Sequence, residues 1–268
     1  MKRVVLPGTD LAISRLSFGT ASLHHLPSSR RRLDLLAVAR DRGFTHFDTA
    51  PSYAFGLAEL ELGRAFGKKR GEVTIATKFG LYSPAGSASG TPSLWLRKGL
   101  GKLSPRFSRP LVDWSVARAA TSLRESLERL RTDYVDILFL HEPSAEAMRS
   151  DELLRWLEGE KKQGTIRAWG ASGEASGLRT SVAHPLAMVL QVRDSTTRFE
   201  ADEILQTGRP LQLTFGYLSA SASQLAPASA VTVLEAALLR NRTGSIVMST
   251  RRPEHIAELT TVADRSPA

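Results

Sequence analysis

The chain has 268 residues, of which 42% are hydrophobic, so it is long enough to bury one large core. It has no cysteine, which excludes disulfides and thiolate metal sites, and no apolar stretch approaches the length of a membrane span. Lysine and arginine outnumber aspartate and glutamate by 36 to 27, which gives a formal charge of +9 and a pI near 10.2. This balance favours an anionic partner, either nucleic acid or a phosphorylated cofactor. The N-terminus has no apolar run of the length of a secretory signal, so we expect a cytoplasmic protein.

The first part of the chain alternates strands and helices after a short hairpin. Apolar residues on both sides of the turn-forming Pro7–Asp10 predict the hairpin over Val4–Leu16. We then predict a strand at Ile13–Thr20, a helix from Ser28 or Ser29 to Asp41, a strand from Phe44, a helix at Leu57–Phe66 and a strand at Val73–Thr77.

The alternation continues to the end of the chain. We predict helix Ser115–Leu130, strand Val135–Leu140, helix Asp151–Lys162, strand Ile166–Ala171, a weak helix near Glu174–Val182, strand Ala187–Val192, helix Phe199–Thr207, strand Leu211–Phe215, helix Val231–Arg240, strand Ser245–Met248 and helix Pro253–Val262. Eight strands, each followed by a helix, predict an α/β fold of the (β/α)8 TIM barrel type with an N-terminal β-hairpin. An open doubly wound sheet is the alternative, but its usual Gly-x-Gly-x-x-Gly turn is replaced here by Gly19-Thr20-Ala21-Ser22.

One segment interrupts the alternation. Residues 80–114 are rich in serine, glycine, proline and basic side chains, and loops of this length usually have a function or are disordered. Because the segment follows a predicted strand end, we expect it to lie over the C-terminal face of the barrel as a lid or substrate loop; a solvated insertion without a role is the alternative. No domain boundary is evident, so we predict one domain over residues 1–268.

Four chemically active side chains follow the ends of consecutive predicted strands. Asp48 ends the second barrel strand and Tyr53 follows it on the loop, while Lys78 ends the third strand and His141 the fourth. An acid at the point where a hydrophobic strand becomes a loop seldom serves packing, because burying an unpaired carboxylate is costly. Since parallel strands lie about 4.8 Å apart and barrels of this type carry their active sites at the carboxyl ends of the strands, we expect the four side chains to converge.

This set of residues suits proton donation. A free tyrosine, with a pKa of ~10, is a poor acid at neutral pH. We expect the Lys78 ammonium to lower the pKa of Tyr53 by favouring the phenolate, and Asp48 to hold that ammonium in place. Taken singly, each residue also has a structural explanation, such as a helix cap for Asp48, a solvated Lys78 or a satisfied core histidine for His141. No cluster has the spacing of metal ligands, so we predict no catalytic metal.

Three motifs that contain these residues resemble the catalytic motifs of the aldo-keto reductase family: Phe-Asp48-Thr-Ala-x-x-Tyr53, Ala-Thr-Lys78 and Leu-His141-x-Pro. The similarity extends over nearly the whole chain. The resemblance implies a (β/α)8 barrel that binds NADPH without a Rossmann fold and reduces small aldehydes or ketones to alcohols. It also implies that Tyr53 donates the proton and that His141 orients the carbonyl group while the nicotinamide delivers hydride.

The resemblance further implies a set of cofactor contacts: Gly19, Thr20, Asp48, Ser172, Gln191, Phe215, Ser249, Thr250, Arg251 and His255. Ser172 and Gln191 match the family residues that hold the carboxamide of the nicotinamide, but the asparagine that usually follows the serine is Gly173 here. Phe215 stands where a tyrosine commonly stacks on the nicotinamide, and a phenyl ring can also stack.

The last of these contacts lie in a loop that resembles a phosphate site. Residues 249–252 supply hydroxyl and guanidinium groups directly before a predicted helix N-terminus, all of which favour an anion and, in this family, the 2′-phosphate of NADPH. His255 and Leu259 replace the arginine and asparagine of many members, which leaves the preference for NADPH over NADH open.

Three other functions are open on sequence alone. The same site could run in the oxidative direction, as an NAD(P)-dependent sugar or alcohol dehydrogenase. The replacements at Gly173, His255 and Leu259 leave room for a cofactor-binding regulatory protein of the same fold. A charge of +9 suits a nucleic-acid binder, but the basic residues are spread along the chain, so we predict no nucleic-acid partner.

We therefore expect a small-molecule carbonyl substrate, no membrane partner, and a monomer or weak homo-oligomer. Because the sequence ends soon after the last predicted helix, we also expect a substrate pocket that is open or is shaped mainly by residues 80–114.

Overall fold

The computed structural model describes residues 1–83, 110–185, 188–222 and 229–265. Its centre is a closed barrel of eight parallel strands, which confirms the predicted (β/α)8 fold. The strands, in order around the barrel, are β3 (Leu16–Gly19), β4 (His46–Asp48), β5 (Thr74–Phe79), β8 (Val135–His141), β9 (Ile166–Gly173), β10 (Val189–Arg193), β11 (Leu213–Phe215) and β12 (Ser245–Met248). Pairing of Ile246 on β12 with Leu16 on β3 closes the barrel.

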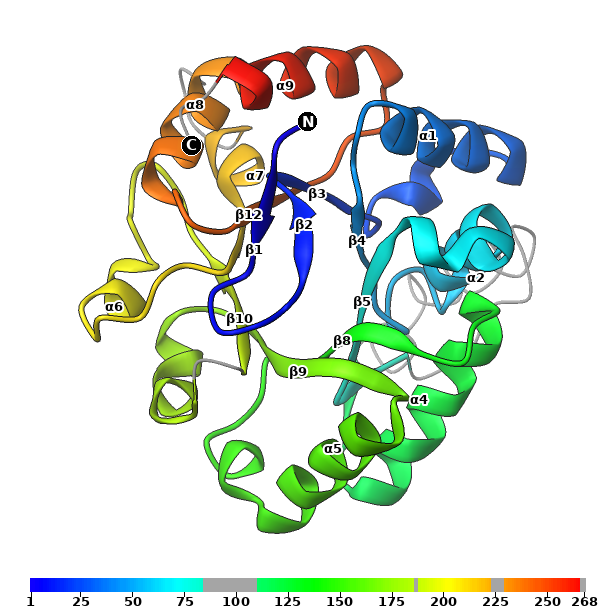
Figure 1. Cartoon of the computed structure of the whole chain (residues 1–268), viewed down its shortest axis with the longest axis vertical. Helices are drawn as coiled ribbons and strands as arrows, with labels where there is room; N and C mark the ends of the chain where they lie inside the picture. Colours follow the sequence, from blue (N-terminus) through cyan, green and yellow to red (C-terminus); the bar gives the residue numbers. More distant parts are fainter. Residues whose placement is uncertain (84–109, 186–187, 223–228, 266–268) are drawn as a thin grey trace, which may run out of the picture.

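The helices surround the barrel, as Figure 1 shows. They are α1 (Ser29–Asp41), α2 (Leu57–Phe66), α4 (Val116–Leu130), α5 (Asp151–Gln163), α6 (Asp202–Leu205), α7 (Tyr217–Ala222), α8 (Ala230–Arg240) and α9 (Pro253–Arg265), with short 3-10 helices η1 (Leu23–His25), η2 (Gly67–Glu72), η4 (Ala147–Arg149) and η5 (Ser176–Ala183). Serine side chains fix several of the helix starts by accepting a backbone N–H of the first turn. These caps are Ser28, Ser115, Ser150 and Ser229.

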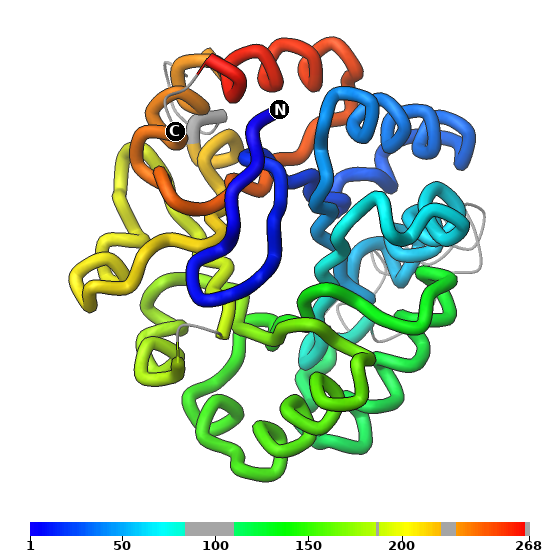
Figure 2. Tube along the Cα trace, in the orientation of Figure 1, coloured from blue at the N-terminus to red at the C-terminus, as the bar shows by residue number. Residues whose placement is uncertain are grey.

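The predicted hairpin is present and covers one mouth of the barrel. Strands β1 (Arg3–Val5) and β2 (Ala12–Ser14) pair antiparallel, and Figure 2 shows this hairpin lying across the barrel. Its apolar side chains Leu6, Leu11 and Ile13 are fully buried against residues that point into the barrel from the strands. Because the hairpin precedes β3, it covers the amino ends of the strands and leaves the carboxyl ends free for a site.

The structure differs most from the predicted elements in four places. The weak helix near residues 174–182 is the 3-10 helix η5, and the helix predicted over 199–207 is reduced to α6, since Phe199 has a φ of 54° that no α-helix accommodates. Helix α7, which follows Gly216 directly after β11, was not predicted. The ends of the segment 80–114, predicted as a loop, form the two-stranded sheet of β6 (Leu81–Tyr82) and β7 (Leu111–Val112).

The remainder of that segment, residues 84–109, lies outside the described residues, as does Ala187 at the start of a predicted strand. The lid over the barrel therefore stays a prediction, and so does the single domain. Within the described part of the chain, no helix combines the length and the apolar character that crossing a membrane requires.

Candidate active site

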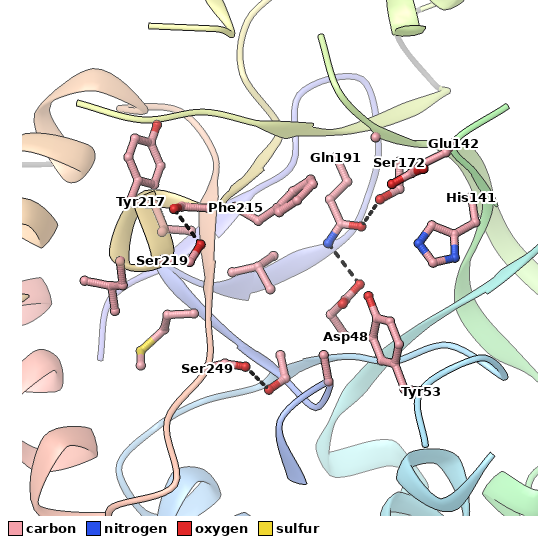
Figure 3. A pocket seen from close by; sticks show the side chains of 18 of the residues that line it. Asp48, Tyr53, His141, Glu142, Ser172, Gln191, Phe215, Tyr217, Ser219 and Ser249 are labelled. Carbon is pink, nitrogen blue, oxygen red and sulfur yellow. Dashed lines mark hydrogen bonds between the residues drawn. The ribbon is translucent and has the colours of Figure 1, made fainter. Parts of the chain in front are cut away.

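The four predicted catalytic side chains meet at the carboxyl ends of neighbouring strands. Asp48 is the last residue of β4 and His141 the last of β8, while Lys78 lies one residue before the end of β5. Asp48, Tyr53 and His141 line a cavity of about 420 Å³ at this end of the barrel. Figure 3 shows Tyr53 and His141 together on one side of this cavity.

Lys78 and Asp48 form a buried ion pair directly beneath the cavity. The Nζ atom of Lys78 donates hydrogen bonds to Oδ1 of Asp48 at 2.6 Å and to the carbonyl oxygen of Thr49 at 2.9 Å. Both charged residues are almost fully buried. Burial by itself would lower the pKa of Lys78, but the charge of Asp48 and the hydrogen bonds to Asp48 and Tyr53 outweigh it, so the pKa of Lys78 is raised. The ammonium therefore stays charged at neutral pH.

Tyr53 lies on an unusual turn between β4 and α2. The three residues that follow it all have left-handed backbone conformations, with φ values of 53° for Ala54, 59° for Phe55 and 83° for Gly56. Only the glycine adopts this conformation without steric cost. The turn places the Tyr53 ring with its centroid 4.9 Å from Nζ of Lys78 and 6.1 Å from the His141 ring, which meets it edge-on at 84°.

The pKa of Tyr53 differs in direction from the sequence-based expectation. Burial of the phenol raises its pKa, and the Lys78 ammonium lowers it through its charge and by hydrogen bonding. Burial is the larger effect, so the net pKa of Tyr53 is raised rather than lowered. The hydroxyl is consequently protonated at neutral pH, which is the state that a proton donor needs.

His141 is a neutral imidazole. Burial and the nearby Lys78 ammonium lower its pKa from 6.5 to about 3. Its Nδ1 atom is buried and has no hydrogen-bond partner within the described part of the chain. A neutral imidazole can donate one N–H group to a carbonyl oxygen, but it cannot act as a strong acid at neutral pH.

A second chain of hydrogen bonds extends the site across the barrel. Ser172 Oγ donates to Oε1 of Gln191 at 2.6 Å, and Nε2 of Gln191 donates to Oδ1 of Asp48 at 2.9 Å. Figure 3 shows this line of contacts along one wall of the cavity. The same carboxylate oxygen thus receives hydrogen bonds from Lys78 and Gln191, which fixes Asp48 from two sides.

The other residues that the resemblance assigns to a cofactor divide into two groups. Gly19, Phe215 and Ser249 line the cavity, and Ser249 Oγ donates to the carbonyl oxygen of Gly19 at 2.8 Å. Thr20 lies outside the cavity lining, because its buried hydroxyl donates to the carbonyl oxygen of Asp48 at 2.9 Å. Thr20 therefore contacts the backbone of the site and not its open space.

Thr250, Arg251 and His255 lie beyond the cavity lining, in the loop before α9 and in its first turn. Thr250 Oγ1 accepts the backbone N–H of Arg252 at 3.2 Å and lies 3.5 Å from Nδ1 of His255. Both arginine side chains are exposed, and neither forms an ion pair with a carboxylate among the described residues. Leu259 is buried in the core face of α9, so it does not face this loop.

Sequence reasoning missed several residues of the cavity. Glu142, directly after His141, and the residues 216–219 at the start of α7 all line it. A charged residue at a strand end was a signal that could have identified Glu142. The α7 residues had no such signal, because the helix itself was not predicted. Among the described residues, no three histidine, aspartate or glutamate side chains are placed to hold a metal ion.

The comparisons with known proteins assign the chain to a family. The model of the Aldo/keto reductase family matches residues 15–207, and the chain belongs to this family. It is 29% identical over 208 residues to the NADH-specific methylglyoxal reductase of Escherichia coli, and the matched region covers 73% of this chain and 59% of that protein. It is 30% identical over 179 residues to the D-threo-aldose 1-dehydrogenase of a Pseudomonas species, and the matched region covers 63% of this chain and 53% of that protein.

A solved structure resembles the fold more completely. The aldo-keto reductase from Klebsiella pneumoniae in complex with NADPH matches with a TM-score of 0.69 and 20% identity, covering 100% of this chain and 92% of that one. The chain spans about half of the length of the curated relatives that it matches, 59% of the first and 53% of the second. Membership of the family therefore rests on the match to the family model, and the similarity to the solved structure supports the fold alone.

Proposed function

We propose that the chain reduces an aldehyde or ketone to an alcohol with NADPH as the hydride donor and Tyr53 as the general acid. The observation that carries this proposal is the buried pair of Lys78 and Asp48 beside a protonated phenol, with a neutral imidazole opposite. A phenol becomes a useful acid only where its anion is stabilised, and a charged lysine at this position supplies that stabilisation.

The proton transfer follows from the charges of these groups. The N–H group of His141 holds the carbonyl oxygen of the substrate, and the Tyr53 hydroxyl donates its proton to that oxygen as the carbonyl carbon is reduced. The phenolate that forms faces the Lys78 ammonium, which Asp48 keeps charged and in place. The hydrogen bonds from Ser172 to Gln191 and from Gln191 to Asp48 hold the carboxylate in its place beside Lys78.

The residues of the cavity fit a nicotinamide dinucleotide. The amide and hydroxyl of Gln191 and Ser172 are suited to a carboxamide, and the half-buried ring of Phe215 at the cavity wall is suited to stacking. When bound there, the nicotinamide would supply the hydride. Beyond the cavity, Arg251 and Arg252 precede the N-terminus of α9, and both the guanidinium groups and the helix dipole favour phosphate.

The two unpaired arginines are our reason for proposing NADPH. The relatives do not agree on this point, because the E. coli protein is named NADH-specific whereas the Klebsiella structure holds NADPH. Separate titrations with NADPH and NADH test the preference. We expect Arg251→Ala to weaken NADPH binding about tenfold and to leave NADH binding within twofold, since only NADPH carries the 2′-phosphate.

The activity itself is tested by oxidation of NADPH in the presence of a panel of aldehydes. We expect Tyr53→Phe to lower kcat by about 10²-fold or more, because the proton donor is lost, while the dissociation constant of NADPH stays within a few-fold. Tyr134→Phe is the matched control, since Tyr134 precedes β8 at the opposite end of the barrel. Equal turnover in both variants would contradict the assigned role of Tyr53.

The oxidative direction is the second candidate, and the similarity to an aldose dehydrogenase favours it. Relative rates with aldehyde plus NADPH and with sugar plus NADP⁺ separate the two directions. A regulatory protein without turnover would show cofactor binding in the titrations and no oxidation of NADPH with any aldehyde.

A further inference from the structure

Glu142 occupies a position of the cavity wall that the proposed chemistry does not use. It directly follows His141, and its backbone has a φ of 53°, a left-handed conformation that residues other than glycine rarely adopt. A hydrogen bond from its N–H group to the carbonyl oxygen of Ser172, at 2.7 Å, holds this conformation at the end of β9. Backbone strain of this kind is found most often where a side chain has a task.

The Glu142 side chain lies close to the last residue of the neighbouring strand. Gly173, the last residue of β9, has no side chain, and a Cβ atom built on it would lie 3.4 Å from both Cα and Cγ of Glu142. The glutamate therefore lies along the bare backbone of Gly173. Figure 3 shows it beside Ser172 and on the same side of the cavity as His141.

The charge of Glu142 has no partner among the described residues. The other carboxylate of the cavity lining, Asp48, is paired with Lys78 at 2.6 Å. Glu174, which follows β9, is paired with Arg193 at 3.2 Å. The charges of Asp48 and Lys78 cancel and His141 is neutral, so the described residues around the proposed position of the substrate carbonyl group carry a net charge of about −1, that of Glu142. The formal charge of the whole protein is +9. The charge of Glu142 also raises the pKa of Tyr53, so its field reaches the proposed proton donor.

We propose that Glu142 determines substrate specificity by charge, admitting uncharged or cationic aldehydes and ketones and disfavouring those with a carboxylate near the carbonyl group, such as 2-oxo acids. This inference rests on the proposed function and adds its substrate class. If the carboxylate of Glu142 lies roughly 8 Å from the charge of a substrate, in an effective dielectric constant of about 30, it changes the preference for a charged over a neutral substrate about tenfold.

Three benzaldehydes of similar shape and different charge test the inference: 4-nitrobenzaldehyde, 4-carboxybenzaldehyde and 4-(trimethylammonio)benzaldehyde. We expect Glu142→Gln to raise the ratio of kcat/KM for the anionic to the neutral aldehyde about tenfold, and to lower the ratio for the cationic to the neutral one by a similar factor. Using ratios between variants cancels the intrinsic reactivity of each aldehyde. High salt should bring the kcat/KM values of the charged aldehydes closer to that of the neutral one in the unmodified protein, because mobile ions screen the carboxylate of Glu142. The Glu142→Gln variant should not show this effect of salt.

Glu174→Gln is the matched control, because it removes the same charge directly after β9 and outside the cavity lining. It should leave both ratios within twofold. If Glu142→Gln leaves the ratios within twofold of those of the unmodified protein, or if Glu174→Gln shifts them equally, the inference is overturned. Far-UV circular dichroism establishes that both variants are folded.

Binding of two inert ligands, benzoate and benzamide, distinguishes failure of this inference from failure of the proposed function. We expect Glu142→Gln to raise the affinity for benzoate relative to benzamide about tenfold by calorimetry. If the affinities change in this way but the protein oxidises no NADPH, the inference about charge selection holds and the proposed reductase reaction is wrong. If the protein reduces aldehydes but the affinities do not change in this way, the proposed reductase reaction holds and the inference about charge selection is wrong.

Discussion

His46 is a buried imidazole that the proposed reaction does not use. It lies in β4 with no exposed surface, and its Nδ1 atom is 2.8 Å from Oγ1 of Thr74 on the neighbouring strand β5. Its Nε2 atom has no hydrogen-bond partner among the described residues. Burial lowers the pKa of His46 from 6.5 to about 4, although Asp48 and Asp136 act in the opposite direction. A proton is thus bound more weakly by this histidine in the folded chain than in the unfolded one.

This difference predicts a loss of stability in mild acid. The contribution of His46 to the free energy of unfolding is fully present above pH 6.5 and is lost as the pH falls toward 4. Over this range the histidine binds a proton in the unfolded chain but not yet in the folded one. The shift corresponds to roughly 3 kcal/mol at most. Urea unfolding at pH 7.5 and pH 4.5 measures it, and we expect His46→Gln to lose less stability between these pH values than the unmodified protein. His25→Gln, which changes an exposed imidazole, is the control. Identical losses in all three proteins would refute the assignment.

At the scale of elements, helix α2 is anchored to helix α4 and strand β5. Glu59 on α2 is fully buried, and it accepts hydrogen bonds from Nε of Arg129 on α4 at 2.7 Å and from Oγ1 of Thr77 on β5 at 2.5 Å. Gly63, one turn further along α2, lies against the end of α4. A Cβ atom at Gly63 would be 2.1 Å from the carbonyl oxygen of Arg129. The two helices therefore pack backbone against backbone at this position.

Two helical glycines should respond oppositely to alanine because of this contact. Gly63→Ala forces the backbone of α4 to move and should destabilise the protein by about 3 kcal/mol. Gly159→Ala in α5 meets no atom within 4 Å and should stabilise it by about 0.5–1 kcal/mol, because alanine favours the helix. Urea unfolding of both variants measures the difference. If Gly63→Ala is as stable as Gly159→Ala, α2 and α4 do not make this close contact.

Elements with strong local signals were predictable, and those set by single backbone angles were not. Helix α4 begins at the cap Ser115 and buries one apolar stripe, so its predicted and observed bounds agree within one residue. Helix α6 is shorter than predicted because Phe199 has a left-handed backbone, for which a phenylalanine gives no warning in sequence. Helix α7 was missed because Gly216, with a φ of 103°, separates it from β11, and its six residues, Tyr-Leu-Ser-Ala-Ser-Ala, are too few to show a helical apolar stripe.

At the scale of the whole molecule, the meeting of the predicted side chains at one end of the barrel could be predicted from the sequence, and their pKa values could not. The strand ends place Asp48, Lys78 and His141 together, because a parallel barrel puts every carboxyl end at one mouth. The direction of the Tyr53 pKa could not be predicted, since it depends on a depth of burial that only the closed cavity fixes. Glu142 was missed for a related reason, because its place in the cavity wall depends on a left-handed backbone directly after β8, which the sequence does not reveal.

Closure of the barrel joins the two ends of the chain, and Arg15 is one of the groups that join them. Its buried guanidinium group donates hydrogen bonds to the carbonyl oxygen of Gly244, just before β12, and to that of Leu238 on α8 at 3.2 Å. Burial lowers the pKa of Arg15, and no carboxylate among the described residues pairs with it. A lysine has a single ammonium group and cannot reproduce the planar fork that reaches both carbonyl groups.

We therefore expect Arg15→Lys to destabilise the protein by about 2–3 kcal/mol, because at least one buried carbonyl group loses its donor. If residues 1–268 form one domain, this loss should appear equally in the fluorescence of the tryptophans, two of which lie at Trp156 and Trp169 in the middle of the chain, and in far-UV circular dichroism. Arg3→Lys, at an exposed position of the hairpin, is the control and should leave both midpoints unchanged. Two separate transitions, or a shift in only one signal, would show that the ends and the middle of the barrel unfold independently, and the single-domain prediction would then be wrong.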